Sequence, residues 1–136
     1  HSEGKNPVAD PVSGYLWDRA KEAGISYRSY GEWIGGAGPE GKGHARAKSL
    51  EGHFNPYYAG FDIGVSDMKR LKVFTDELEE FSAKGEFPRL AIVRLPNDHT
   101  AGAAKGALTP KAYVAQNDLA LGKMVEALSH SPFWWA

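Results

Sequence analysis

The run Leu90-Ala-Ile-Val93 constrains the fold more than any other feature of this sequence. Its four successive apolar side chains would point to both faces of a strand, which is typical of a parallel sheet covered by helices. Amphipathic helical patterns flank this run, over 67–84 before it and 110–129 after it. Helices that alternate with apolar strands indicate a layered α/β fold. We therefore predict that fold class, with Arg89–Leu95 as a central strand of a parallel sheet flanked by helices.

Residues with known positional preferences mark the ends of the two flanking helices. Ser66 and Thr109 suit N-cap positions, Pro110 suits the first helical position, and Gly85 suits the residue after a C-cap. Apolar residues three and four apart predict a core-facing stripe on each helix. The predicted stripes are Leu71, Phe74, Leu78 and Phe81 on the first, and Val114, Leu121, Met124, Val125 and Leu128 on the second. A solvated face is predicted for Lys69, Arg70 and Lys72.

The N-terminal half predicts smaller elements. Residues 1–12 are predicted to be an extended arm, and Ser13 is a candidate N-cap for a short helix that ends at Gly24. The apolar face of that helix would be Leu16, Trp17 and Ala20. Alternation predicts a strand over Ile25–Tyr30. The glycine-rich segment 35–64 lacks periodicity, and we expect an ordered irregular loop because it holds packing aromatics: Phe54, Tyr57, Tyr58 and Phe61.

Length and composition exclude several classes of protein. The 136 residues suit a single domain over 1–136, and 16 basic against 17 acidic residues give a formal net charge of −1. We expect no nucleic-acid partner, because no global positive field is present. We expect no membrane span, because no apolar run reaches ~18 residues. The absence of cysteine excludes thiolate chemistry and cysteine-based metal sites.

The polar run Pro96-Asn-Asp-His-Thr-Ala-Gly102 directly follows the apolar strand. Ligands of open parallel sheets bind at the carboxyl ends of the strands, so these side chains are placed where chemistry usually occurs. Histidine can bind an anion, exchange a proton or ligate a metal near neutral pH. We therefore name His99 as the candidate catalytic residue, with Asp98 and Thr100 as candidate substrate contacts. The alternative is a polar turn whose side chains only cap the backbone.

Asn117 is a further candidate substrate contact, because it lies on a largely apolar helix face where a buried amide needs hydrogen-bond partners. The alternative is an internal tether that holds the Asp98–Gly102 loop.

The scattered histidines His44, His53 and His130 match no metal-binding spacing, so no metal site is predicted in this chain. The run Gly35-Gly-Ala-Gly38 resembles a phosphate-binding loop only superficially. The lysine and hydroxyl residue of that motif do not follow it, so we predict no phosphate-binding loop here.

Several motifs in sequence order resemble the bacterial phosphoesterase family that includes phospholipase C and acid phosphatase enzymes, within the alkaline-phosphatase-like superfamily. The residues that carry this resemblance are Gly14-Tyr-Leu-Trp17, Tyr27-Arg-Ser-Tyr-Gly-Glu32, Pro96-Asn-Asp-His-Thr100, Thr109-Pro110, Ala115-Gln-Asn-Asp118, Ala120-Leu-Gly122 and Leu128-Ser-His-Ser-Pro-Phe-Trp134. The resemblance implies a fragment of a layered alkaline-phosphatase-like fold. It also implies that His99 matches the family's loop histidine, which is expected to face the phosphate.

The same resemblance implies that much of the catalytic site lies elsewhere in a longer protein. The family's metal ligands and hydroxyl nucleophile would precede His1, and an acidic pair with an Asp-His-Val motif would follow Trp135. We therefore expect a divalent metal in the full-length parent and none in this segment. We also expect negligible activity from the 136 residues alone. The family favours a secreted or periplasmic parent that hydrolyses a phosphoester substrate.

A non-catalytic α/β binding module is the alternative function. In that case the loop from Gly35 to Gly64 would be the recognition surface. A third expectation concerns association between copies. Two strands make a thin sheet, and Trp134 and Trp135 place apolar area near the end of the sequence, so we expect a homo-oligomer formed through exposed edges.

Overall fold

The computed structural model describes residue 8 and residues 10–36 and 41–135, and it is a mixed α/β structure. Contacts between residues divide the chain into two units. The first unit combines the chain up to residue 61 with residues 88–94, and the second combines residues 62–87 with residues from 95 onward. Most of the extended arm predicted over 1–12 lies outside the described residues.

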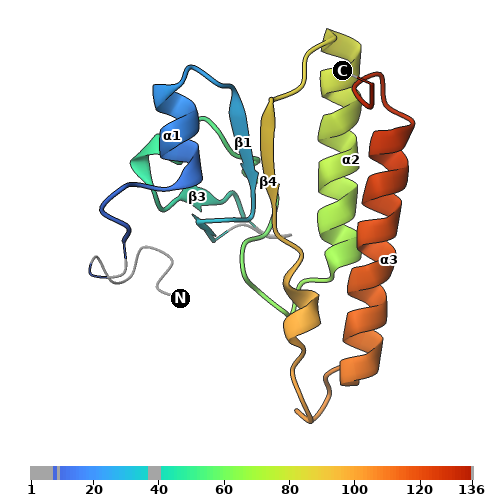
Figure 1. The fold of residues 1–136 in the computed structure, drawn as a ribbon. Helices are drawn as coiled ribbons and strands as arrows, with labels where there is room; N and C mark the ends of the chain where they lie inside the picture. Colours follow the sequence, from blue (N-terminus) through green and yellow to red (C-terminus); the bar gives the residue numbers. More distant parts are fainter. Residues whose placement is uncertain (1–7, 9, 37–40, 136) are drawn as a thin grey trace. The chain divides into compact units, whose positions relative to one another are not determined.

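The first unit contains a small parallel sheet (Figure 1). Strand β1 (Tyr27–Tyr30) pairs in parallel with β4 (Leu90–Val93), in a register that aligns the first residues of the two strands and also the last. The parallel pairing that we predicted is therefore confirmed. Within the described residues β4 pairs with β1 alone, and all four of its residues are half-buried. The prediction of a central strand covered on both faces is wrong for this part of the chain.

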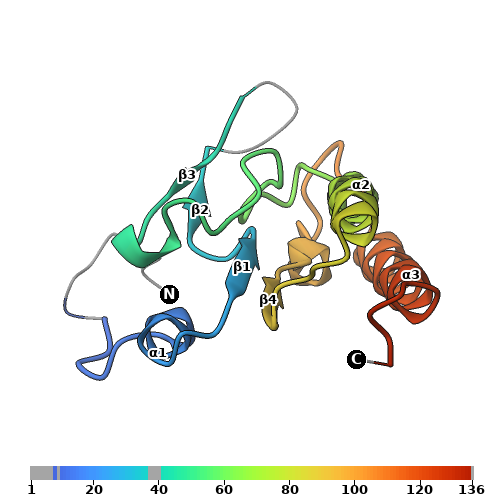
Figure 2. The ribbon, with the colours of Figure 1, turned by 90° about the horizontal axis from the view of Figure 1, so that it is seen from above.

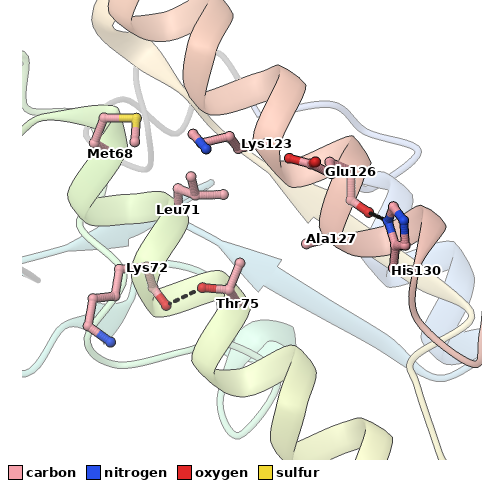
Figure 3. Close-up of a pocket in the computed structure, with 8 residues that line it drawn as sticks. All are labelled: Met68, Leu71, Lys72, Thr75, Lys123, Glu126, Ala127 and His130. Carbon is pink, nitrogen blue, oxygen red and sulfur yellow. Dashed lines mark hydrogen bonds between the residues drawn. The ribbon is translucent and has the colours of Figure 1, made fainter.

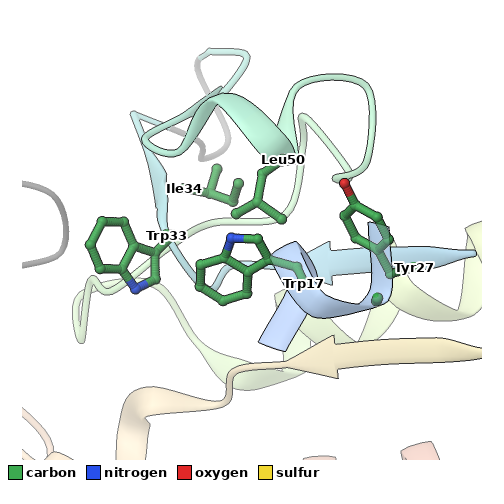
Figure 4. Close-up of a cluster of buried hydrophobic side chains, with 6 residues drawn as sticks. Trp17, Tyr27, Trp33, Ile34 and Leu50 are labelled. Carbon is green, nitrogen blue, oxygen red and sulfur yellow. The ribbon is translucent and has the colours of Figure 1, made fainter. Parts of the chain in front are cut away.

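Helix α1 (Leu16–Glu22) contributes to an aromatic core in the first unit. Figure 4 shows Trp17 of this helix beside Ile34 and Leu50. The helix begins after Tyr15, and not at Ser13 as predicted, because the Asp18 carboxylate accepts a hydrogen bond from the Tyr15 backbone N–H at 2.7 Å. Trp17 and Ala20 are buried as predicted, whereas Leu16 is exposed.

Part of the predicted irregular loop has regular structure. Strand β2 (Ile34–Gly35) pairs antiparallel with β3 (His44–Ala45), and a short 3-10 helix, η2 (Lys48–Leu50), follows. The glycine run extends to residue 38, and its residues 37 and 38 lie outside the described residues. Of the aromatics expected to pack the loop down, Tyr58 is fully buried, while Tyr57 and Phe61 are exposed.

The second unit contains two long helices that lie side by side (Figure 2). Helix α2 (Asp67–Lys84) begins after Ser66, whose hydroxyl accepts a hydrogen bond from the Met68 N–H, and ends at Gly85 with φ 75°. Helix α3 (Pro110–Ser129) begins after Thr109, whose hydroxyl accepts from the Ala112 N–H. These ends confirm the predictions made from the capping residues. No helix of the described residues is both long enough and apolar enough to cross a membrane.

The predicted apolar stripe agrees with the buried face of α2 but only in part with that of α3. On α2, Leu71, Phe74 and Leu78 are buried as predicted. On α3, Val114, Leu121 and Val125 are 49%, 49% and 47% exposed, so the predicted stripe is wrong at these positions. The buried residues of α3 are Tyr113, Ala120 and Met124. Asn117 lies on the same side of α3 as these three residues. Its side chain donates a hydrogen bond to Asp67 of α2, which is consistent with the packing of this face against α2.

Candidate functional site

The loop predicted to carry chemistry follows β4 and belongs to the second unit. We call the segment Leu95–Gly102 the His99 loop. It opens with a 3-10 helix, η3 (Pro96–His99), in which Pro96 and Asn97 are buried. The next two residues, Asp98 and His99, are exposed. The loop therefore rests on a buried base and places Asp98 and His99 at the surface.

Thr100 adopts a backbone conformation that is rare for a β-branched residue. Its φ of 53° and ψ of 168° lie at the border of a region occupied almost entirely by glycine. Its hydroxyl accepts a hydrogen bond from the Gly102 N–H at 3.2 Å, which supports the turn locally. Such strain costs about 1–3 kcal/mol and persists only where the surrounding structure imposes it. The residue directly after His99 is therefore strained.

Asn97 anchors the start of the loop through its backbone and its side chain. Its backbone N–H donates to Asp67 Oδ2 at 3.0 Å, and its Oδ1 accepts from the Asp67 backbone N–H at 2.7 Å. Its amide Nδ2 donates to the carbonyl oxygens of Ile63 and Val65, both at 3.2 Å. Asn97 has no exposed surface, so these bonds form away from competing water.

Asn117 lies on α3 and contacts the same region from the other side. Its Nδ2 donates to Asp67 Oδ2 at 2.9 Å and to the Leu95 carbonyl oxygen at 2.8 Å. Both hydrogens of the amide group are thereby used within the protein. Asn117 is thus an internal tether, but it binds Asp67 and Leu95 and not the predicted Asp98–Gly102 segment, and a direct contact with substrate stays a prediction.

Asp67 and Arg70 form a buried ion pair beneath the His99 loop. Both side chains are 0% exposed, and Arg70 Nη1 lies 3.0 Å from Asp67 Oδ1. Arg70 also donates to the carbonyl oxygens of Val65 at 2.6 Å and Asp62 at 2.8 Å. The predicted solvated face is therefore wrong at Arg70. Sequence reasoning missed both residues, because an acidic residue after an N-cap and a basic residue between lysines are ordinary surface signals.

In the part of the chain that the structure describes, the titratable groups do not gather into a metal site. Among the residues that the structure describes, no group of three or more histidine, aspartate or glutamate side chains is placed to hold a metal ion. His53 stacks on Tyr27 with ring centroids 4.3 Å apart, and His130 Nδ1 lies 2.8 Å from the Glu126 carbonyl oxygen. We therefore assign no metal ligand among the described residues.

A second polar cluster lies in the first unit, at the carboxyl ends of β1 and β4. Arg94 Nε lies 2.9 Å from Glu32 Oε2, and the Arg94 guanidinium is 5.4 Å from the centre of the Phe61 ring. The Tyr58 hydroxyl donates to the Arg94 carbonyl oxygen at 2.9 Å. Trp33 follows Glu32 with φ 56°, which is unusual for so large a side chain. An ion pair and aromatic contacts therefore lie at this edge of the sheet.

A groove of ≈ 520 Å³ lies between α2 and α3, within the second unit (Figure 3). Apolar side chains of both helices line it, and Lys72, Lys123, Glu126 and His130 add charged or titratable groups. Lys72 is already paired with Asp76 at 2.9 Å. The groove holds none of the candidate residues of the His99 loop.

No model of a protein family, no curated protein and no solved structure matches this chain. The interpretation of the site therefore depends on its residues and on its geometry.

Proposed function

We propose that this chain is part of a metal-dependent phosphoesterase of alkaline-phosphatase-like layering, and that His99 contacts a phosphate oxygen of the substrate. The observation that carries the proposal is the strained backbone of Thr100, directly after the exposed His99. An observed outlier of this kind is a reason to propose function, because strain at a loop is retained where a particular geometry is needed. The motif resemblance supplies the class of substrate.

The proposed chemical role of His99 is electrostatic. An imidazole N–H donates a hydrogen bond to a phosphoryl oxygen, and charge assistance strengthens that bond as negative charge develops. Asp98 and Thr100 lie beside it in the chain and are the proposed additional substrate contacts. The metal of the family would supply Lewis-acid activation of the phosphoryl group. Its ligands and the nucleophile are proposed to come from residues outside these 136.

The test uses the product of the complete gene that encodes this sequence. Hydrolysis of p-nitrophenyl phosphate and of phosphatidylcholine vesicles is measured for the unmodified protein, His99→Ala and His130→Ala. Loss of one preorganised donor typically lowers kcat about 10²-fold to 10³-fold, so we expect a loss of that size for His99→Ala. His130→Ala is the matched control and keeps the original rate. Equal rates in all three proteins would refute the role of His99.

The 136-residue chain alone is expected to show no turnover, because one histidine cannot assemble a reacting geometry. Metal-dependent hydrolysis by this chain, lost in His99→Ala, would contradict that expectation. If the complete gene product hydrolyses no phosphate ester, the alternative of a non-catalytic α/β binding module is favoured instead.

A further inference from the structure

We infer that Asp67 and Asn117 are positioning residues for His99, an inference that rests on the phosphoesterase function proposed above. Asp67 begins α2 and Asn117 lies within α3, 50 positions later in the chain. The two side chains meet at 2.9 Å beneath the His99 loop. In this role they act on the substrate through the loop that they hold.

The two side chains fix the backbone on both sides of Pro96. Asn117 Nδ2 binds the Leu95 carbonyl oxygen at 2.8 Å, and Asp67 Oδ2 accepts the Asn97 N–H at 3.0 Å. Pro96 is buried, and its ring restricts φ, so little freedom remains at the start of η3. The direction in which the chain leaves Asn97 is thereby set.

His99 lies two residues beyond this anchored point. The Thr100 N–H donates to the Asn97 carbonyl oxygen at 3.1 Å, which closes a turn around Asp98 and His99. Thr100 then takes its strained conformation. A strained residue needs a rigid support, and the contacts of Asp67 and Asn117 supply one. His99 is thus held between an anchored residue and a strained one.

The chemistry of the support also favours a positioning role. A buried ion pair is a poor source of stability, because the loss of hydration offsets much of the attraction. It does supply directional acceptors, which apolar side chains lack. Arg70 binds Asp67 Oδ1, while Asp67 Oδ2 accepts from both Asn97 and Asn117. Arg70 therefore orients a carboxylate whose other oxygen joins the two anchors.

The first experiment compares Asn117→Ala with Gln116→Ala in the 136-residue chain. Gln116 is a matched control, because it is the neighbouring amide on α3 and its Oε1 accepts a hydrogen bond from the Ser66 hydroxyl, outside the His99 loop, at 2.8 Å. Amide hydrogen exchange is measured by NMR for the Asn97 and Thr100 N–H groups and for the interior of α2. We expect Asn117→Ala to speed exchange in the loop at least about 10-fold more than in α2, because local opening is decoupled from global unfolding. In Gln116→Ala the ratio stays as in the original chain.

Asp67→Asn is the second variant, and its folding is checked by circular dichroism. If it folds, the Asn97 amide exchanges faster relative to α2, as in Asn117→Ala. If it does not fold, the comparison of Asn117→Ala with Gln116→Ala decides alone. Unchanged loop exchange in Asn117→Ala, or an equal change in Gln116→Ala, overturns the inference.

Activity of the complete gene product separates this inference from the proposed function. We expect Asn117→Ala to lower kcat at least about 10-fold with KM little changed, because misplacement of a catalytic group affects the transition state most. A loosened loop with full activity in His99→Ala would show that the positioning is real and the proposed function wrong. If activity is lost in His99→Ala but unchanged in Asn117→Ala, the proposed function is supported and the positioning role of Asn117 is wrong.

Discussion

The buried pair of Asp67 and Arg70 allows a quantitative test of the second unit. The perturbations are Arg70→Met, Asp67→Asn and the double variant. Arg70→Met removes hydrogen bonds to the Val65 and Asp62 carbonyl oxygens and to Asp67 Oδ1, of 2.6, 2.8 and 3.0 Å. It leaves a carboxylate with 0% exposure without its cation. Removing one partner of a buried ion pair costs about 3–5 kcal/mol, and we expect the free energy of unfolding to fall by this amount. Asp67→Asn leaves the guanidinium buried and has a similar cost.

The double variant should lose less than the sum of the two single variants. With both charges removed, no uncompensated ion remains, and methionine fills much of the volume of arginine. We expect the loss in the double variant to be about 2 kcal/mol smaller than the sum of the two single losses. This difference lies within the range of interaction energies found for residues in direct contact. The measurement is urea-induced unfolding followed by far-ultraviolet circular dichroism.

The matched control is the exposed pair of Lys72 and Asp76 on the same helix. Their charged atoms lie 2.9 Å apart, but the side chains are 75% and 56% exposed. Lys72→Met should change the free energy of unfolding by no more than about 0.5 kcal/mol. If Arg70→Met costs no more than this control, or if the effects of the two single variants simply add, the two buried charges do not compensate each other as the structure indicates.

Three further outcomes are expected. Loss of hydration, a hydrogen bond to Asp10 and nearby carboxylate charge raise the pKa of Tyr15 from 10.0 to about 12, so the fold favours the neutral phenol. The resulting contribution to stability is complete below pH 10 and lost as the pH rises to about 12; ultraviolet titration checks the pKa, which Asp10→Asn should lower. Gly60→Ala would place a Cβ 2.1 Å from the Ile34 carbonyl oxygen and should cost about 3 kcal/mol or more in urea unfolding. Met124→Ala should cost about 2–5 kcal/mol by the same assay, and a cost below 1 kcal/mol would show that this face of α3 is not core.

The ends of the long helices were predictable because capping is a local property. Ser66 and Thr109 satisfy backbone N–H groups two or three positions ahead, and Gly85 takes a left-handed conformation at the end of α2. These interactions need only a few consecutive residues. Capping residues alone do not predict the start of the short helix α1. Its first turn is fixed by the Asp18 carboxylate, which accepts from the Tyr15 N–H, and not by Ser13.

Periodicity predicted only part of the buried face of α3, because Met124 is buried as predicted but other residues of the stripe are not. Apolar residues at Val114, Leu121 and Val125 form a plausible stripe, yet they lie on the more exposed side. The face that packs includes Asn117, whose partners are Asp67 and Leu95. Hydrophobic spacing contains no information about a polar contact between residues so far apart in the chain.

The same physical limit applies to the candidate site. The position of His99 after an apolar strand is a local signal, so the sequence could indicate which loop to examine. Residue type reveals neither the strain at Thr100 nor the burial of Arg70. The carboxylate that Arg70 binds, Asp67, is itself fixed by Asn97 and Asn117, which lie 30 and 50 positions away in the chain. An arginine with this local sequence belongs at the surface unless a carboxylate and two carbonyl oxygens already surround it. The support of the His99 loop is therefore a property of the folded second unit, and the test of that support has to be made on the folded chain.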